Sequence, residues 1–106
     1  MNLHREEEIP WTDKFPGAKV KFLHGERMTV TLWQFEPDTD LPEHSHPHEQ
    51  ITMVREGNIR LDVDGESRVL GPGDILVIPP DAVHSAHAET KVRVLDVFSP
   101  RRDDFK

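Results

Sequence analysis

Glycine and proline interrupt this chain so often that few windows are long enough to form a helix. Its 106 residues include 9 prolines and 6 glycines. The segments between them are mostly short, and such spacing is typical of strands joined by turns. We therefore expect an all-β fold, in a chain whose length suits one domain. The main breaks are Pro16, Gly17, Gly25, Pro37, Pro42, Pro47, Gly57, Gly65, Gly71, Pro72, Gly73, Pro79, Pro80 and Pro100.

The window at 28–32 alternates between apolar and polar residues, which is the pattern of a half-buried strand. Met28, Val30 and Leu32 alternate there with threonines. We expect these three side chains to face the core. The three residues that follow, 33–35, break strict alternation and predict a β-bulge.

A second alternating window, 59–63, is followed by Asp64-Gly65 and by an extended segment at 67–70. Asp-Gly between two strands predicts a hairpin, because a type I′ turn requires positive φ at both central positions. We expect a two-residue hairpin turn at Asp64 and Gly65. About seven to nine strands are expected in all, and the further ones are 19–23, 50–55, 74–78 and 92–98.

The longest window free of glycine and proline, 81–99, permits two structures. Ala82, Ala86 and Ala88 would support a helix at its start. The valines and Phe98 in its second half favour a strand, because β-branched and aromatic residues pack well on a pleated sheet. We prefer the strand.

Charge and cysteine content exclude several classes of function. The chain has 20 acidic and 13 basic residues and a formal net charge of -7, which argues against a concentrated basic face for nucleic acid or anionic membranes. The absence of cysteine excludes disulfides, thiolate metal sites and cysteine nucleophiles. No apolar signal core or membrane-spanning stretch is present in the sequence. We expect a cytoplasmic protein that binds neither nucleic acid nor membrane.

Histidine is the most informative residue type, with seven copies. Five of them form two clusters, which are His44, His46 and His48, and His84 and His87. Side chains alternate along an extended chain, so His44 and His46 project to the same side. Pro47 helps to turn the chain so that the next strand returns Gln50 toward the same point. His84 supplies a third, distant nitrogen, and these four residues are the predicted metal ligands.

Three neutral imidazoles and an amide oxygen suit Mn, Fe, Ni, Cu or Zn and leave coordination positions open. We expect one such divalent ion per chain, acting as a Lewis acid toward a bound oxygen. Glu49 should face away by alternation. His4 and His24 are expected at the surface or as caps. For His48 and His87 two roles stay open, either beside the pocket and its ligands or at the surface.

The spacing around the first cluster resembles the first motif of the cupin superfamily. That motif is a glycine, five residues, His-x-His, three or four residues, a glutamate, six residues and a glycine. Here His44 and His46 are followed at matching spacing by Gln50 and Gly57. Gln50 replaces the glutamate, and Asp38 replaces the leading glycine.

The second cluster resembles the second cupin motif, which is a glycine, five residues, Pro-x-Gly, two residues, a histidine, three residues and an asparagine. Gly73, Pro79 and His84 match it in register. Asp81 replaces the second glycine, and Ala88 replaces the asparagine. The resemblance therefore keeps the metal-binding histidine and departs at two other positions.

The two motifs and the strands around them extend the resemblance to nearly the whole chain. It implies a double-stranded β-helix, or jelly-roll, barrel in one domain. The expected parts are an N-terminal arm at 1–17, a barrel core at 18–99 and a C-terminal tail at 100–106. A homodimer is also implied, with Ile51 and Met53 as candidate contacts on the face of their strand opposite the ligands.

A narrower resemblance is to the small single-domain cupins of pectin and alginate breakdown, which convert ring-form 4,5-unsaturated uronates to the linear ketone. The stretches that carry it are Pro10-Trp11, 44–50 and 95–105. It implies that the metal ligands are His44, His46, Gln50 and His84. It also implies that the active site includes Asp96, Phe98 and Arg102.

Asp96 is unusual even without the resemblance. It shares one face of its strand with Val92, Val94 and Phe98, which places a carboxylate on an apolar stripe. A buried carboxylate needs a partner or a function. Facing the pocket, Asp96 could act as general acid or base, whereas facing outward it would be an ordinary solvated residue.

Arg102 also has two interpretations. It could hold a substrate carboxylate in a bidentate pair, or it could pair with Asp103 or Asp104 at the surface. Trp11 is expected to cover a sheet edge or a subunit contact. The candidates for the wall of the substrate pocket are Phe98, His48 and Trp33.

These observations favour a metal-dependent enzyme of isomerase type that acts on a small acidic sugar derivative. In that hypothesis Asp96 moves a proton and Arg102 anchors the substrate carboxylate. Two alternatives stay open, which are a non-catalytic module that binds a small molecule and an iron-dependent dioxygenase.

Overall fold

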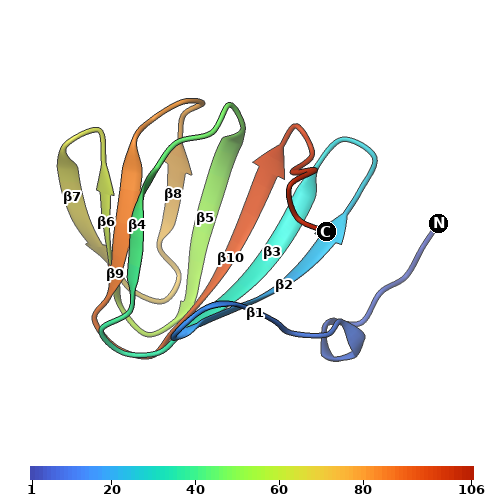
Figure 1. Ribbon diagram of the computed structural model, residues 1–106, viewed down its shortest axis with the longest axis horizontal. Coiled ribbons are helices and arrows are strands. Elements are labelled where there is room, and N and C mark those ends of the chain that lie inside the picture. Colours follow the sequence, from blue (N-terminus) through green and yellow to red (C-terminus); the bar gives the residue numbers. More distant parts are fainter.

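Two antiparallel sheets face each other in the computed structural model, which describes residues 1–106 (Figure 1). The strands are β1 (Thr12–Phe15), β2 (Ala18–His24), β3 (Thr29–Phe35), β4 (Asp40–His44), β5 (Glu49–Glu56), β6 (Ile59–Val63), β7 (Glu66–Leu70), β8 (Ile75–Ile78), β9 (His84–Ala88) and β10 (Val92–Ser99), after a short 3-10 helix, η1 (Glu6–Glu8). One sheet has the order β1-β2-β3-β10-β5-β8, and the other has the order β4-β9-β6-β7. The predicted all-β jelly-roll barrel is confirmed.

The predicted hairpin is present between β6 and β7. Ile59 pairs with Leu70 and Val63 pairs with Glu66, so the turn contains two residues. Asp64 and Gly65 have φ angles of 47° and 83°. Both central residues therefore adopt the left-handed conformation that a type I′ turn requires.

Two strands, β1 and β4, lie outside the windows predicted to be strands, whereas β9 confirms the strand preferred for part of the window 81–99. β9 occupies part of the window for which a helix was the second alternative. Its residues alternate in burial, with Ala86 and Ala88 facing the core. The alanines therefore serve as small interior residues of a strand, where β6 packs against them in the same sheet.

The buried face of β3 is the opposite of the predicted one. Its interior residues are Thr29, Thr31, Trp33 and Phe35. Val30 and Leu32 lie half-buried on the outer face, and Met28 is exposed. The predicted bulge at 33–35 is also absent, because β3 keeps continuous register with β2 and β10. The predicted face of β3 was wrong because the barrel interior is polar at the end where Thr29 and Thr31 lie, so that their hydroxyl groups point inward.

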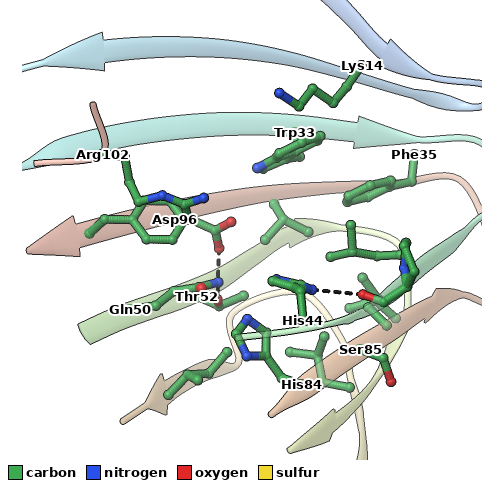
Figure 2. A pocket seen from close by; sticks show the side chains of 18 of the residues that line it. Lys14, Trp33, Phe35, His44, Gln50, Thr52, His84, Ser85, Asp96 and Arg102 are labelled. Carbon is green, nitrogen blue, oxygen red and sulfur yellow. Dashed lines mark hydrogen bonds between the residues drawn. The ribbon is translucent and has the colours of Figure 1, made fainter. Parts of the chain in front are cut away.

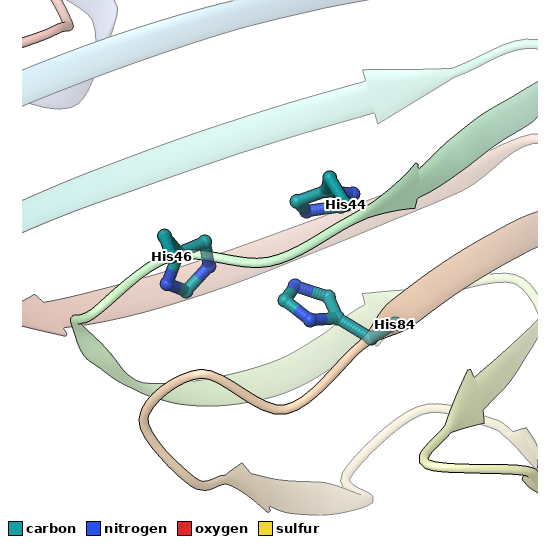
Figure 3. A group of neighbouring side chains, drawn as sticks. All are labelled: His44, His46 and His84. Carbon is teal, nitrogen blue, oxygen red and sulfur yellow. The ribbon is translucent and has the colours of Figure 1, made fainter.

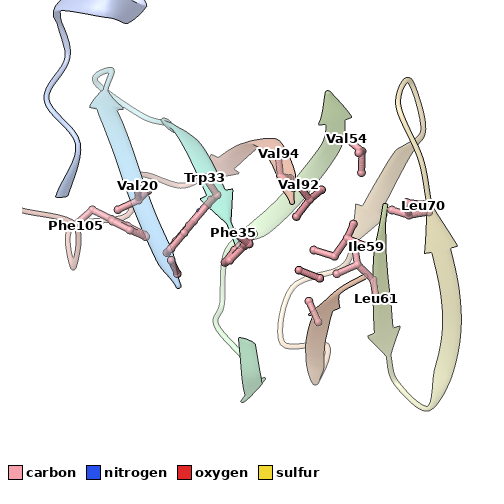
Figure 4. Close-up of a cluster of buried hydrophobic side chains, with 13 residues drawn as sticks. Val20, Trp33, Phe35, Val54, Ile59, Leu61, Leu70, Val92, Val94 and Phe105 are labelled. Atoms are coloured by element: carbon pink, nitrogen blue, oxygen red, sulfur yellow. The ribbon is translucent and has the colours of Figure 1, made fainter. Parts of the chain in front are cut away.

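The apolar core fills the barrel away from that polar end (Figure 4). Trp33 stacks on Phe35 with ring centroids 5.4 Å apart. Phe105, from the segment expected to form the C-terminal tail, is only 7% exposed and meets the edge of Trp33. The tail therefore closes one end of the core, since aromatic rings contribute large buried areas.

Part of the segment expected to form an N-terminal arm lies on the outer face of the larger sheet. Trp11 contacts the ammonium groups of Lys19 and Lys21 on β2, each 4.7 Å from its ring centroid, and Arg93 on β10. Lys21 also donates a hydrogen bond to the carbonyl of Glu6. The first residues then extend away from the barrel (Figure 1). No helix is both long and apolar enough to cross a membrane.

Two of the departures from the cupin motifs keep the backbone that glycine would adopt. Asp38 and Asp81 have φ angles of 64° and 66°. Aspartate tolerates the left-handed region better than most residues do. Gly57 matches the glycine that ends the first motif. A Cβ at this position would lie 2.0 Å from the carbonyl oxygen of Lys91, so only glycine fits.

We predict that Asp81→Gly raises the free energy of unfolding by about 0.5–1 kcal/mol, because the left-handed conformation costs an L-residue about 1–2 kcal/mol and glycine recovers part of that cost. Urea denaturation measures the change. Asp13→Gly is the control, since Asp13 lies in β1 without positive φ and its replacement is expected to lower stability. Destabilisation by both changes would contradict the prediction.

Candidate metal centre

Three histidines meet where β4 approaches β9 at one end of the barrel (Figure 3). His44 ends β4 and His84 begins β9, and the two residues pair across the smaller sheet. His46 lies two residues after His44. One ligand nitrogen from each ring lies within 4.8 Å of the other two. The structure therefore brings together the three histidines that the sequence predicted as ligands.

The three imidazoles share one hydrogen-bonding arrangement. In each ring Nδ1 donates to a backbone carbonyl, and the acceptors for His44, His46 and His84 are Pro42, His48 and Ala82, at 2.8, 3.0 and 2.8 Å. A proton on Nδ1 leaves the lone pair on Nε2. Such bonds fix the ring orientation and the tautomer of metal-binding histidines. All three Nε2 atoms are thus available as ligands.

Gln50 adds a fourth donor atom. Its side-chain nitrogen donates to the Thr52 hydroxyl at 2.8 Å, so its oxygen Oε1 faces His46 Nε2 at 3.1 Å. Two lone pairs then face each other, an arrangement that a cation between them stabilises. The Nε2 atom of His84 is buried without a hydrogen-bond partner. The donor set fits a divalent transition metal ion.

Burial favours the neutral form of two of these imidazoles. Desolvation lowers the pKa of His46 and the pKa of His84, and the nearby Arg102 charge lowers both further. Only neutral imidazole has the lone pair that binds a metal. The environment therefore favours metal binding at neutral pH.

Asp96 faces the barrel interior beside this group, which settles its orientation. The residue is 6% exposed, and its neighbours across the sheet are Thr31 on β3 and Thr52 on β5. The Thr52 hydroxyl donates to Asp96 Oδ1 at 2.7 Å. Because Gln50 donates to Thr52, a continuous hydrogen-bond chain joins the predicted metal ligand Gln50 to the carboxylate (Figure 2).

Burial raises the pKa of Asp96 to about 6, although hydrogen bonds from Thr52 and Gln50 and the charge of Arg102 oppose the rise. A group with such a pKa has accessible acid and carboxylate forms near neutral pH. General acids and bases are most effective under that condition.

The raised pKa of Asp96 predicts a pH dependence of stability. The folded state binds this proton more tightly than the unfolded state, so the carboxyl group stabilises the fold below about pH 4 and loses that contribution as pH rises through about 6. The loss amounts to about 3 kcal/mol for two pKa units. We expect the free energy of unfolding of Asp96→Asn to gain about that much on the wild type between pH 4 and pH 7.

Urea unfolding of both proteins with a chelator present measures this difference. Titration of His46 and His84 has the opposite sign, since their lowered pKa values favour the fold at higher pH. It affects wild type and Asp96→Asn alike and cancels in the comparison. A constant difference between the two proteins over this pH range would contradict the prediction.

Arg102 lies across the ring of Phe98, with the guanidinium carbon 4.7 Å from the ring centroid. Of the two interpretations given for Arg102 above, the structure shows the second, a pairing with Asp104. Its Nε and one terminal nitrogen bind the two carboxylate oxygens of Asp104 at 2.9 and 2.7 Å. These bonds lower the pKa of Asp104 to about 2. The pair is fully charged at neutral pH.

A cavity of about 230 Å³ opens between these groups and the apolar core (Figure 2). This volume lies below the roughly 300–1,000 Å³ of sites for drug-sized ligands, which favours a ligand the size of one sugar ring. The predicted wall residues Trp33 and Phe98 line it, and 11 of its 21 lining residues are hydrophobic.

The other predicted histidines lie outside the cavity. His48 stacks edge to face against His46 and does not line the cavity, although its carbonyl orients that ring. His87 bonds Asp40 at 2.6 Å at the surface. His24 bridges the Thr29 hydroxyl and the carbonyl of Phe105, while His4 is exposed.

Sequence reasoning missed two residues at the site, Thr52 and Lys14. Thr52 could have been found, because it lies two residues from Gln50 and alternation places both on one face. Lys14, which also lines the cavity, lies on the unpredicted strand β1. No pattern in the sequence indicates that Lys14, which is exposed, also borders the cavity.

Comparison with known proteins identifies similar chains. Residues 31–98 match the model of the Cupin domain family. The pectin degradation protein KdgF of Dickeya dadantii (strain 3937) is 29% identical over 103 residues, which cover 94% of each chain. The structure of KdgF from Halomonas sp. superposes with a TM-score of 0.94 at 34% identity, covering 100% of this chain and 99% of that one. An RmlC-like cupin from Shewanella frigidimarina NCIMB 400 gives a TM-score of 0.94 at 30% identity, covering 100% and 96%.

Proposed function

The chain belongs to the cupin family, and on that premise we propose that it is a metal-dependent enzyme that opens a ring-form 4,5-unsaturated uronate to the linear ketone. Its similarity to KdgF proteins of pectin degradation supports a uronate as substrate. The observation that carries the proposal is the position of Asp96. A buried carboxylate with a pKa of about 6 lines the same cavity as two of three converging histidines.

His44, His46, His84 and Gln50 would hold the ion. When bound there, a divalent metal supplies a Lewis acid that withdraws electron density from a substrate oxygen. The Nδ1 bonds to backbone carbonyls hold the three rings in place before the substrate arrives. The Gln50 amide is held in turn by Thr52, so the site is preorganised.

Asp96 moves the proton in this proposal. It removes the proton from the hydroxyl at the anomeric carbon, and the electron pair of that O–H bond forms the new carbonyl. The bond between the anomeric carbon and the ring oxygen breaks, and the ring oxygen becomes the second carbonyl. The alkene carbon C4 then receives the proton from Asp96. No atom is gained or lost, so the reaction is an isomerisation.

Two other residues have positioning roles, one toward Asp96 and one toward the substrate. Thr52 fixes the Asp96 carboxylate with its hydroxyl. Arg102 binds Asp104 through Nε and one terminal nitrogen, and it offers the other terminal nitrogen to a substrate oxygen. The ring of Phe98 packs against the Arg102 guanidinium in a cation–π contact. Trp33 and its apolar neighbours exclude water from the far side of the sugar ring of the substrate.

The direct test follows the alkene absorbance of a 4,5-unsaturated uronate with metal-loaded protein, chelator-treated protein and buffer. We expect faster loss with the loaded protein alone. A rate equal to buffer would overturn the proposed reaction. Galacturonate binding without conversion of the unsaturated uronate would favour a non-catalytic module, and oxygen uptake under iron loading would favour a dioxygenase.

We also propose that the protein is a homodimer that pairs through the outer face of its larger sheet. Two cross-strand rows of apolar side chains run over β3, β10, β5 and β8 on this face. The rows are Val30, Val97, Ile51 and Val77, and Leu32, Leu95, Met53 and Ile75. Ile51, Val77 and Ile75 are 41%, 56% and 59% exposed. Such contiguous apolar area marks an interaction surface.

Light scattering tests the dimer. We expect twice the mass of the chain at micromolar concentration, and the mass of one chain for Val77→Asp, because a charge buried in the contact is costly. A single-chain mass for the wild type would overturn the proposal.

A further inference from the structure

Two basic and two acidic side chains line the cavity. Its charged lining residues, apart from the histidines, are Lys14, Asp96, Arg102 and Asp104. Arg102 is already paired with Asp104 in two charge-assisted bonds. Lys14 makes no ion pair. Lys14 is therefore the one basic side chain of the lining that pairs with no carboxylate of the chain.

The backbone of β1 directs Lys14 to the cavity. Asp13 pairs with Lys19 and Phe15 pairs with Ala18, and the register shifts between Asp13 and Phe15. Lys14 is the extra residue at this irregularity. Neighbouring residues of a regular strand point to opposite faces, yet Lys14 and Phe15 both line the cavity. A bulge re-aims side chains in this way and is common beside active sites.

The position of the ammonium group suits a ligand that spans the cavity. Lys14 Nζ lies 5.1 Å from the ring centroid of Phe105, whose π face attracts the ammonium group. In Figure 2 Lys14 lies beyond Trp33, on the side of the cavity opposite His44 and His84. A ligand with one end at the histidines can therefore place an anionic group at Lys14.

We propose that Lys14 binds the carboxylate of the acidic substrate and is a specificity-determining residue. It selects a sugar acid over the neutral sugar and directs the reacting end of the ring toward the histidines and Asp96. Replacing it removes the cationic side chain with which the substrate carboxylate would pair at that side of the cavity. The inference rests on the proposed function for the identity of the acid.

The experiment compares galacturonate with galactose as probes for metal-loaded wild type, Lys14→Gln, Lys14→Arg and Lys91→Gln. Binding is measured by calorimetry or by NMR titration. Lys91 is exposed in the turn before β10 and lies outside the cavity, so its replacement removes the same charge without touching the site. Galactose reports the contacts that do not involve the carboxylate.

We expect Lys14→Gln to weaken galacturonate binding about tenfold to a hundredfold and to leave galactose binding unchanged. Lys14→Arg should restore most of the affinity, and Lys91→Gln should behave as wild type. Equal galacturonate binding by wild type and Lys14→Gln would overturn the inference. So would no galacturonate binding by the wild type, or equal weakening of both sugars.

Turnover separates this inference from the proposed function. If the unsaturated uronate is converted, Lys14→Gln should raise KM and change kcat little, and a loss confined to kcat would contradict the inference. If the uronate is not converted while galacturonate binding depends on Lys14, the proposed reaction fails and the carboxylate site stands.

Discussion

Replacing His84 by alanine is expected to reduce uronate turnover to the rate in buffer and to weaken metal binding more than about 100-fold. Changes in residues that merely orient a ligand already cost about 10- to 100-fold in metal affinity, and His84 supplies a ligand atom itself. Its Nε2 is buried and has no hydrogen-bond partner within the chain. Metal titration with a competing chelator measures the affinity, and alkene absorbance measures turnover.

His87→Ala is the matched control for this change. His87 lies on the same strand, β9, three residues from His84, but it pairs with Asp40 at the surface. We expect its replacement to leave metal affinity and turnover unchanged. Equal metal affinity in His84→Ala and wild type would show that the ion is held elsewhere.

Asp96→Asn is expected to lower turnover by about 10²- to 10⁴-fold, which is the usual contribution of a general acid or base. Asparagine keeps an oxygen that can accept the bond from Thr52, but it cannot exchange a proton at this pH. Metal affinity should stay at the wild-type level, because the four predicted ligands are intact. The same change should stabilise the fold at neutral pH, since it removes the cost of a buried charge.

The pairing of these two effects makes the prediction specific. A merely structural Asp96 would lose activity through lower stability, whereas the proposed role combines lower activity with higher stability. Asp103→Asn is the control, because Asp103 bonds Arg101 at the surface and does not line the cavity. Full turnover by Asp96→Asn would remove Asp96 from the mechanism.

The metal centre was predictable because its information is local in the sequence. The His-x-His spacing puts two rings on one side of an extended chain, and the following strand returns Gln50 to the same place. The remote ligand His84 was predicted from the second histidine cluster and agrees with the second motif, although no local pattern shows that β4 and β9 are neighbours. The structure supplies that contact directly, because His44 pairs with His84.

Other features could not be predicted because they depend on contacts between distant segments. The inward threonines of β3 follow from the polar end of the cavity, which exists only when β3, β10 and β5 lie together. Phe105 enters the core because the tail folds back over Trp33. Lys14 faces the cavity because of an irregular pairing between β1 and β2. Hydrophobic alternation reports none of these arrangements.

Metal content of the protein purified without added metal tests the central claim most directly. Elemental analysis of the wild type should find about one divalent transition metal ion per chain, and analysis of a His44→Ala, His46→Ala variant purified in parallel should find almost none. Both proteins should give the same far-ultraviolet circular dichroism, so that loss of metal is not loss of fold. Equal metal content in the two proteins would contradict the site on which the proposed function depends.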